Sequence, residues 1–235
     1  MIDIHTHILP DVDDGSNSLE MSRNMLKNAI DQGITHIILT PHEYLHSSIY
    51  YSKNELQAKF QAFQQQIMDL PIKVYLGGEI YYTEKALKML YQNDFLTFHD
   101  SSYILIEFPM HVEVDIDEIL FNIRYKGFKP ILAHPERYSY LNYNQIASIK
   151  DHSLIQINAA SILGLHGKDI KKRALGLLKR KLVDFVASDS HNINSRPVNL
   201  KEAYDDVAKK FSKEYAEEIF TNNQMKLIKE IDLTQ

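Results

Sequence analysis

The first fifteen residues, MIDIHTHILPDVDDG, place two histidines one residue apart and follow them with three aspartates. Side chains two residues apart in a strand point to the same face, so His5 and His7 would share one face. Neighbouring imidazoles suit a divalent metal, and hard oxygen ligands could come from Asp11, Asp13 and Asp14. A polar strand end with a solvated turn explains the same residues, because short motifs often occur by chance. The rest of the chain has to decide between these interpretations.

Further histidines and carboxylates fall at the carboxyl end of nearly every strand that the sequence predicts. In parallel α/β folds these ends meet on one face, and that face carries the active site. One such residue alone is more often structural, but repetition across six strands indicates a shared site. Burying these groups together without cations would be energetically unfavourable. The candidate metal ligands are His5, His7, Asp14, His42, Glu79, Glu107, His134, Asp189 and His191.

Charge and ligand type narrow the choice of metal. Four candidates are carboxylates, so two divalent ions would neutralise them, and three would leave a positive site suited to an anionic phosphate ester. Mixed nitrogen and oxygen ligands without sulfur favour manganese, iron or zinc over calcium. An EF-hand calcium loop is excluded by spacing, because DVDDGS places Gly15 where that loop needs its third oxygen ligand.

Residues that could contact a substrate lie near these ligands. Arg137 in HPER and Arg196 in SDSHNINSR could each hold phosphate oxygens in a two-pronged geometry that lysine does not offer. Surface salt bridges are the alternative for both arginines. His46 is a possible substrate contact, and Tyr44 could line a mouth for an aromatic substrate, although such tyrosines more often simply pack. The stretch GLHGKD lacks the P-loop pattern and predicts a turn, with a structural role for His166.

Strand-like and helix-like segments alternate along the whole chain. The expected strands cover residues 2–7, 34–42, 71–79, 103–109, 129–137, 154–158 and 182–191. The expected helices lie near 17–33, 53–69, 84–93, 115–126, 143–150, 168–181, 199–211 and 213–231. Apolar strands that alternate with helices indicate an α/β fold with a parallel sheet, and seven such units could close into a barrel. A doubly wound open sheet is the alternative, and in either case we expect a single domain over 1–235.

Composition restricts the class of protein further. Hydrophobic content of 44%, charged content of 24% and a net charge of −5 are ordinary for a globular protein and give no general attraction to nucleic acid or anionic lipid. The sequence has neither a secretory leader nor an apolar run of roughly 18 residues, so we expect a cytoplasmic protein without direct membrane insertion. It contains no cysteine, which excludes a thiolate nucleophile and thiolate metal ligands.

These stretches together resemble a known family. DIHTHILPDVDDG, TPH, GGEIYYT, YILIEFP, AHPERY and VASDSHN, in this order, are similar to the motifs of the PHP (polymerase and histidinol phosphatase) superfamily. Within it the chain resembles the CpsB/CapC branch of bacterial manganese-dependent protein-tyrosine phosphatases. The resemblance runs from residue 1 to the SRP at 195–197.

The resemblance implies a distorted (β/α)7 barrel of the PHP type and three bound divalent metals, expected to be manganese, with iron, zinc or magnesium as alternatives. It implies hydrolysis of phosphotyrosine on the tyrosine-rich tail of a bacterial kinase that governs capsule or exopolysaccharide synthesis. All nine candidate ligands match metal positions of the family, and Arg137 and Arg196 match its phosphate-contacting arginines. We count Asp189 as catalytic as well as metal-binding. Because there is no cysteine, water has to be the nucleophile.

Two other functions fit a similar cluster. A small-molecule phosphatase of the histidinol-phosphate type, or a phosphodiesterase of the same superfamily, would use similar metals. A regulatory module that binds metal without turnover is a third possibility, and the complete ligand set with both arginines argues against it. The sequence does not identify the acid that would protonate the leaving group.

Overall fold

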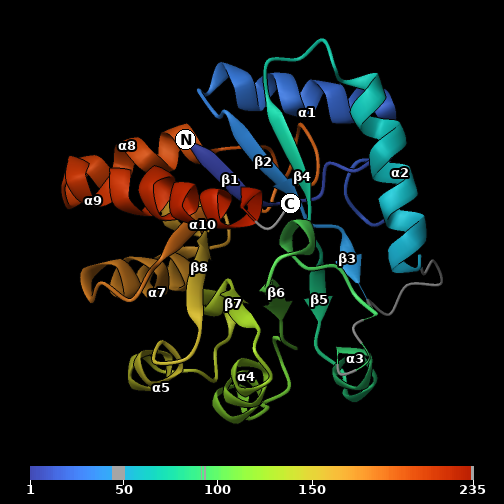
Figure 1. Cartoon of the computed structure of the whole chain (residues 1–235). Helices are drawn as coiled ribbons and strands as arrows, with labels where there is room; N and C mark the ends of the chain where they lie inside the picture. The colour runs from blue at the N-terminus through green and yellow to red at the C-terminus, as the bar shows by residue number, and fades with distance from the viewer. Residues whose placement is uncertain (44–50, 91, 93, 234–235) are drawn as a thin grey trace.

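The architecture is mixed α/β, and every strand pair is parallel. The computed structural model describes residues 1–43, 51–90, 92 and 94–233. One sheet has the order β1 (Ile2–Thr6), β2 (His36–Leu39), β4 (Lys73–Leu76). The other has the order β3 (His42–Glu43), β5 (Glu79–Tyr81), β6 (Tyr103–Glu107), β7 (Lys129–Ala133), β8 (Leu154–Asn158), β9 (Phe185–Ala187). Figure 1 shows the helices arranged around these strands.

Two of the expected strands are each divided into two. The segment 34–42 breaks at Pro41, which cannot donate a ladder hydrogen bond, and 71–79 breaks at a pair of glycines. A Cβ on Gly77 would lie 2.5 Å from the Phe98 ring, and a Cβ on Gly78 would lie 2.2 Å from the Glu43 carboxylate. Only glycine therefore fits where the chain steps from the first sheet to the second.

The two sheets meet where β1 lies beside the end of β9. Thr6 and Ser190 form an isolated parallel bridge, and the Asp189 amide donates to the His5 carbonyl oxygen at 2.9 Å. Asp3, fully buried on β1, accepts a hydrogen bond from the Ser188 amide at 3.0 Å. The strands thus follow one another in space, but in the described residues their pairing forms two sheets that meet at the bridge between Thr6 and Ser190, and the expected closed barrel is not confirmed.

The helices agree with the expected segments, except that one helix is added and the expected helix over 213–231 is divided into two. Their bounds are α1 (Leu19–Asp31), α2 (Lys53–Gln66), α3 (Glu84–Leu90), α4 (Ile116–Tyr125), α5 (Tyr143–Ile149), α6 (Ala159–Leu163), α7 (Lys168–Lys179), α8 (Leu200–Lys210), α9 (Lys213–Glu217) and α10 (Asn223–Asp232). The sequence did not predict α6, a five-residue helix directly after β8. Short turns of other helix types are η1 (Phe98–Asp100), η2 (Pro135–Arg137) and η3 (Glu218–Asn222). None of the helices in the described ranges is long and apolar enough to span a bilayer.

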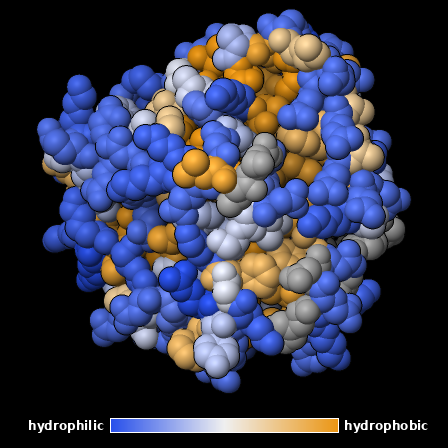
Figure 2. All heavy atoms as spheres, viewed as in Figure 1, coloured by the Kyte–Doolittle hydropathy of each residue, from blue (hydrophilic) through white to orange (hydrophobic). Residues whose placement is uncertain are grey.

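Apolar packing leaves one end of the strands free for polar side chains. A hydrophobic cluster between the strands contains Ile4, Ile38 and Leu105, and α10 packs against it through Leu227 and Ile231. A larger cluster lies between the strands and the surrounding helices. Figure 2 shows a mostly hydrophilic outer face, with hydrophobic residues visible near α1 and β4. The aliphatic core thus fixes the strands from both sides.

Glu43 supports the strand that carries His42. Its carboxylate is buried and accepts from the Leu96 amide through both oxygens, at 3.1 and 3.0 Å. Burial raises the pKa of Glu43 from 4.5 to about 8, even though the Leu96 amide opposes the shift. The native state therefore holds the proton more tightly than the unfolded chain, and the resulting stability is lost as the pH rises from 4.5 towards 8.

We expect Glu43→Gln to weaken this pH dependence, because glutamine can still accept from Leu96 and does not ionise. The free energy of unfolding, measured by urea denaturation between about pH 5 and 9, should fall less steeply in the variant than in the wild type. Parallel pH slopes for the two proteins would show that Glu43 is already ionised in the native state.

Candidate metal centre

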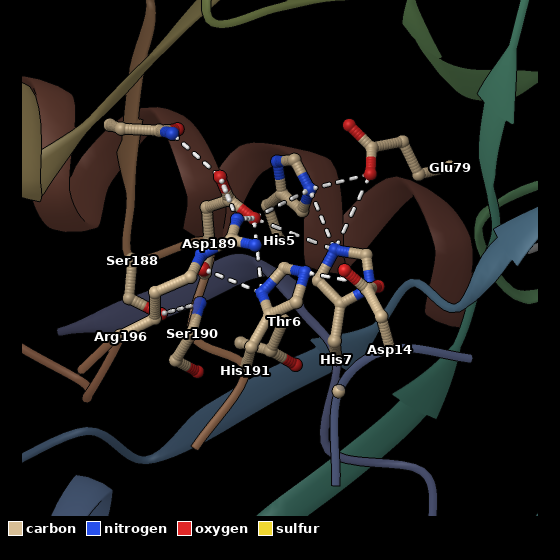
Figure 3. A network of polar contacts seen from close by, with 12 residues as sticks. His5, Thr6, His7, Asp14, Glu79, Ser188, Asp189, Ser190, His191 and Arg196 are labelled. Atoms are coloured by element: carbon tan, nitrogen blue, oxygen red, sulfur yellow. Dashed lines mark hydrogen bonds and ion pairs between the residues drawn. The ribbon is translucent and has the colours of Figure 1, made fainter. Parts of the chain in front are cut away.

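All nine candidate ligands converge at the carboxyl ends of the strands. Figure 3 shows His5 from β1 and His7, which directly follows this strand, beside Glu79, with Asp189, His191 and Asp14 around them. Each of three groups could hold one metal, because the ligand atoms within a group lie within 4.8 Å of one another. The groups are His7, Asp14, His42 and His191; His5, His7 and Asp189; and His42, Glu79 and Glu107. The ninth residue, His134, lies next to the third group through Glu79.

Glu79 lies among four imidazoles. Its Oε2 is 3.2 Å from His5 Nε2, 3.3 Å from His7 Nε2 and 3.1 Å from His42 Nδ1. Its Oε1 lies 3.2 Å from His134 Nε2. The pairing of β3 with β5 places His42 directly opposite Glu79, so the strand register itself brings these two residues together.

Two ligands are directed into the cluster by unusual backbone geometry. Asp189 and His134 both have positive φ, 54° and 35°, a conformation that non-glycine residues adopt at some energetic expense. Asp189 Oδ1 consequently lies 3.5 Å from both His7 Nε2 and His191 Nδ1. His134 Nε2 lies 3.7 Å from Glu107 Oε1. The strained turns after β7 and β9 therefore serve the site.

The outer part of the cluster is open to solvent. Asp14 is 57% exposed, and its Oδ1 lies 3.4 Å from both His42 Nε2 and His191 Nε2. The other candidate ligands have side chains that are buried or, for His42, 11% exposed. Access from solvent is therefore on the side of Asp14 and His42.

The protein alone balances these charges by shifting protons. Burial disfavours a charged His5, but Glu79 and Asp189 outweigh burial and raise its pKa to about 9. Burial also disfavours a charged His42, whose pKa Glu79 nevertheless raises to about 10. Burial and the nearby Glu79 raise the pKa of Glu107 to about 7. Neighbouring groups are thus forced into opposite charge states.

Divalent cations fit these donors. Burial lowers the pKa of His134 to about 4 and, together with His7, that of His191 to about 4, so both rings are neutral at pH 7. A neutral imidazole is the form that binds metal. Among the described residues, His191 Nε2 is buried without a hydrogen-bond partner. Four carboxylates, five imidazoles and no sulfur suit manganese, iron or zinc.

Neighbouring polar residues orient the ligands. The Asp13 carboxylate lies 2.7 Å from His7 Nδ1 and also accepts from the His42 amide at 3.0 Å. Asp13 therefore lies behind the His7 ring, and neither it nor Asp11 belongs to a metal group, contrary to the broader expectation that all three aspartates could be ligands.

Sequence reasoning missed two further orienting residues on β8. Gln156 Oε1 lies 3.1 Å from His5 Nδ1, and Asn158 Nδ2 donates to Asp189 Oδ2 at 2.7 Å. Both are fully buried. The available signal was the alternation of polar and apolar residues in LIQIN, which places two amides on one face of a strand predicted to be buried.

Both predicted arginines lie beside Asp189. Arg196 Nη2 is 2.9 Å from each Asp189 oxygen, and Arg137 Nη1 is 3.7 Å from Oδ2. Asp189 is only 3% exposed, so these contacts differ from the surface salt bridges considered as the alternative. Both arginines line a cavity of about 220 Å³. Their role in holding phosphate stays a prediction.

Arg173 holds the turn that presents Arg137. From α7 its guanidinium donates to the carbonyl oxygens of Glu136 at 2.9 Å, Tyr138 at 2.6 Å and Leu141 at 2.8 Å. The helix α7, expected as a basic helix, thus fixes η2 in place through Arg173. Two other residues considered as substrate contacts, His46 and Tyr44, lie outside the described residues.

Comparisons with known proteins agree with this site. The family model described as "Capsular polysaccharide synthesis, CpsB/CapC" matches residues 1–229. Tyrosine-protein phosphatase CpsB of Streptococcus pneumoniae is 39% identical, with 97% of this chain and 98% of the relative covered. Tyrosine-protein phosphatase YwqE of Bacillus subtilis is 36% identical, with 91% and 86% covered.

The chain is also similar to solved structures. A crystal structure from work on YwqE of Bacillus subtilis and CpsB of Streptococcus pneumoniae, described as unique metal-dependent tyrosine phosphatases, aligns with a TM-score of 0.85. It shares 33% identity, and the alignment covers 92% of this chain and 90% of that one. A histidinol phosphate phosphatase from Lactococcus lactis aligns with a TM-score of 0.57 at 13% identity, covering 93% and 94%, which shows a shared fold alone.

We expect Asp13→Ala to lower metal affinity by about 10-fold to 100-fold, because the variant loses the carboxylate that orients His7. Calorimetric titration of metal-free protein with Mn²⁺ measures the change. Asp11→Asn is the matched control, since Asp11 is exposed and belongs to none of the three groups. Equal affinities in wild type and Asp13→Ala would show that His7 needs no support from Asp13.

Proposed function

The chain belongs to the CpsB/CapC family, and from this we propose that it is a metal-dependent protein-tyrosine phosphatase, a phosphoric monoester hydrolase. One observation carries the proposal: the nine-residue cluster and both arginines adjoin one another in a chain whose relatives over nearly its full length are named tyrosine phosphatases. The chemistry agrees, because the cluster suits cations and the arginines suit an anionic phosphate.

The residues divide the work between them. Because the sequence contains no cysteine, the nucleophile is water. Metals held by the nine ligands would supply Lewis-acid stabilisation of phosphate charge and activate water. Arg137 and Arg196 hold the phosphate oxygens and stabilise the charge that grows on them in the transition state. Asp189, which contacts both arginines, links phosphate binding to the metal cluster.

We further propose that the site binds three divalent metals. Manganese is the metal proposed in the cell, with iron, zinc or magnesium as alternatives. Support comes from the three ligand groups and from charge: three divalent ions against four carboxylates leave a positive site. A positive site attracts a phosphate ester. The ligands come from strands spread over the chain, so we treat residues 1–235 as a single domain and retain the distorted (β/α)7 barrel as the interpretation of its strand order.

The proposed substrate is the phosphorylated, tyrosine-rich tail of a bacterial tyrosine kinase that governs capsule or exopolysaccharide synthesis. The family description, capsular polysaccharide synthesis, supports this assignment. A cytoplasmic location follows from that partner. The net charge of −5 gives the chain no general electrostatic attraction to nucleic acid.

The function is tested by removing the metal. Chelation and dialysis should abolish hydrolysis of a phosphotyrosine peptide, and Mn²⁺ should restore it, because the sequence contains no cysteine nucleophile. Histidinol phosphate and a single-stranded oligonucleotide serve as comparison substrates at matched concentrations. A higher kcat/KM for histidinol phosphate would favour the small-molecule phosphatase. Full activity in metal-free protein would refute the mechanism.

We expect Arg137→Lys to retain the full metal complement and lose about 30-fold to 1000-fold in kcat/KM, which corresponds to about 2 to 4 kcal/mol. An ammonium keeps the charge but not the two-pronged geometry. Arg124→Lys on α4 is the matched control, because Arg124 lies outside this cavity. Metal analysis and kinetics on one sample decide, and a wild-type rate in Arg137→Lys would assign Arg137 a structural role.

A further inference from the structure

The cavity beside the arginines extends beyond the metal cluster. Besides Arg137 and Arg196 it is lined by His166, Ser195 and Asn199, and Asp189 is the one candidate metal ligand in its wall. At about 220 Å³ it has room for a group the size of a side chain, less than the space of a typical cofactor site. Asn199 Oδ1 is buried there without a hydrogen-bond partner in the described part of the chain.

The turn between α6 and α7 places His166 in this cavity. Two glycines with positive φ, Gly164 at 88° and Gly167 at 102°, bracket the residue and allow the chain to fold back sharply. Lys171 on α7 donates to the Leu163 carbonyl oxygen at 3.1 Å and so fastens the two helices together. The stretch GLHGKD therefore forms a turn that holds His166 in position.

Ser161 fixes the orientation of the His166 ring. Ser161 is fully buried on α6, and its Oγ lies 3.0 Å from His166 Nδ1. The ring is only partly buried, and its second nitrogen, Nε2, makes no hydrogen bond to the described residues. Ser161 thus holds one nitrogen, which leaves Nε2 available to contact a ligand. This is how histidines that transfer protons are usually arranged.

The surroundings of His166 suit contact with a phosphate ester. Burial lowers its pKa, Arg137 and Arg196 lower it further, and Asp189 opposes them. The ring lines the same cavity as both arginines. A phosphate dianion held by the two arginines would bring negative charge next to the ring and favour its protonated form. Substrate binding would thus charge the ring where a donor is needed.

We propose that His166 is a catalytic residue that donates the Nε2 proton to the tyrosyl oxygen as it leaves, with Ser161 as its positioning residue. The inference rests on the proposed function and goes beyond it by naming the leaving-group acid. In this step the oxygen of water forms a bond to phosphorus. The bond from phosphorus to the tyrosyl oxygen breaks, and its electron pair goes to that oxygen. The proton of His166 completes the tyrosine hydroxyl, and the proton released by water restores His166 through solvent.

The test compares two substrates that differ in their need for an acid. The leaving group of a phosphotyrosine peptide is a weakly acidic phenol. The leaving group of p-nitrophenyl phosphate is a much more acidic phenol, which needs little protonation. For His166→Gln in manganese-loaded protein, we expect kcat to fall about 100-fold with phosphotyrosine peptide and by less than about 5-fold with p-nitrophenyl phosphate. Ser161→Ala should show a smaller loss with the same preference.

Controls separate this role from a structural one. His36→Gln, at the amino end of β2, should leave both rates unchanged. Metal content and thermal stability should match the wild type in every variant. The proposal would be overturned if His166→Gln lost the same factor in kcat on both substrates or kept the wild-type rates. It would also be overturned if Ser161→Ala lost the same factor on both substrates. Failure of the wild type to hydrolyse either substrate would overturn the proposed function together with it.

Discussion

The position of Glu79 is the constraint on which the rest of the structure depends. One buried carboxylate lies within 3.3 Å of four imidazole nitrogens, which come from the ends of two strands and from the turn after a third. Such an arrangement is stable only if every donor is held in place and the total charge is compensated. The register of β3 against β5, the glycine pair before Glu79 and the strained turn at His134 all serve that purpose.

The outer layers of the site can be understood from the same constraint. Asp13, Gln156 and Asn158 each contact the side of a ligand that faces away from the cluster, so that the ligand cannot rotate out of it. Arg173 likewise holds in place the turn that carries Arg137. On the arginine side, Ser161 orients His166 in the same way. Arg137 and Arg196 themselves contact Asp189, whereas the turn of Arg137 and the His166 ring are held by Arg173 and Ser161.

The convergence of the nine candidate ligands was predictable from sequence because strand ends can be recognised locally. Apolar runs identified each strand, and the parallel α/β pattern required their carboxyl ends to meet, which brought His5 and Asp189 together although they are far apart in sequence. The division of two strands was less accessible, since Gly77 acts through its close approach to Phe98 in another segment, and Pro41 lies within a run that otherwise predicts one strand. The closed barrel was not confirmed, because the contact between β1 and β9 depends on a bridge and on the Asp3 side chain, which local patterns do not reveal.

The junction of β1 with β9 also bears on how the protein is made. His5 and His7 leave the ribosome first, yet Asp189 and His191, which complete two of the three ligand groups, are among the last residues of the strand region. Domains generally fold as units during synthesis, and contacts of such long sequence separation form late. A nascent chain that ends before residue 189 lacks part of the cluster, so two of the three ligand groups can be completed only when translation is nearly finished. Premature termination products would therefore lack two of the metal groups even where most of their strands have formed.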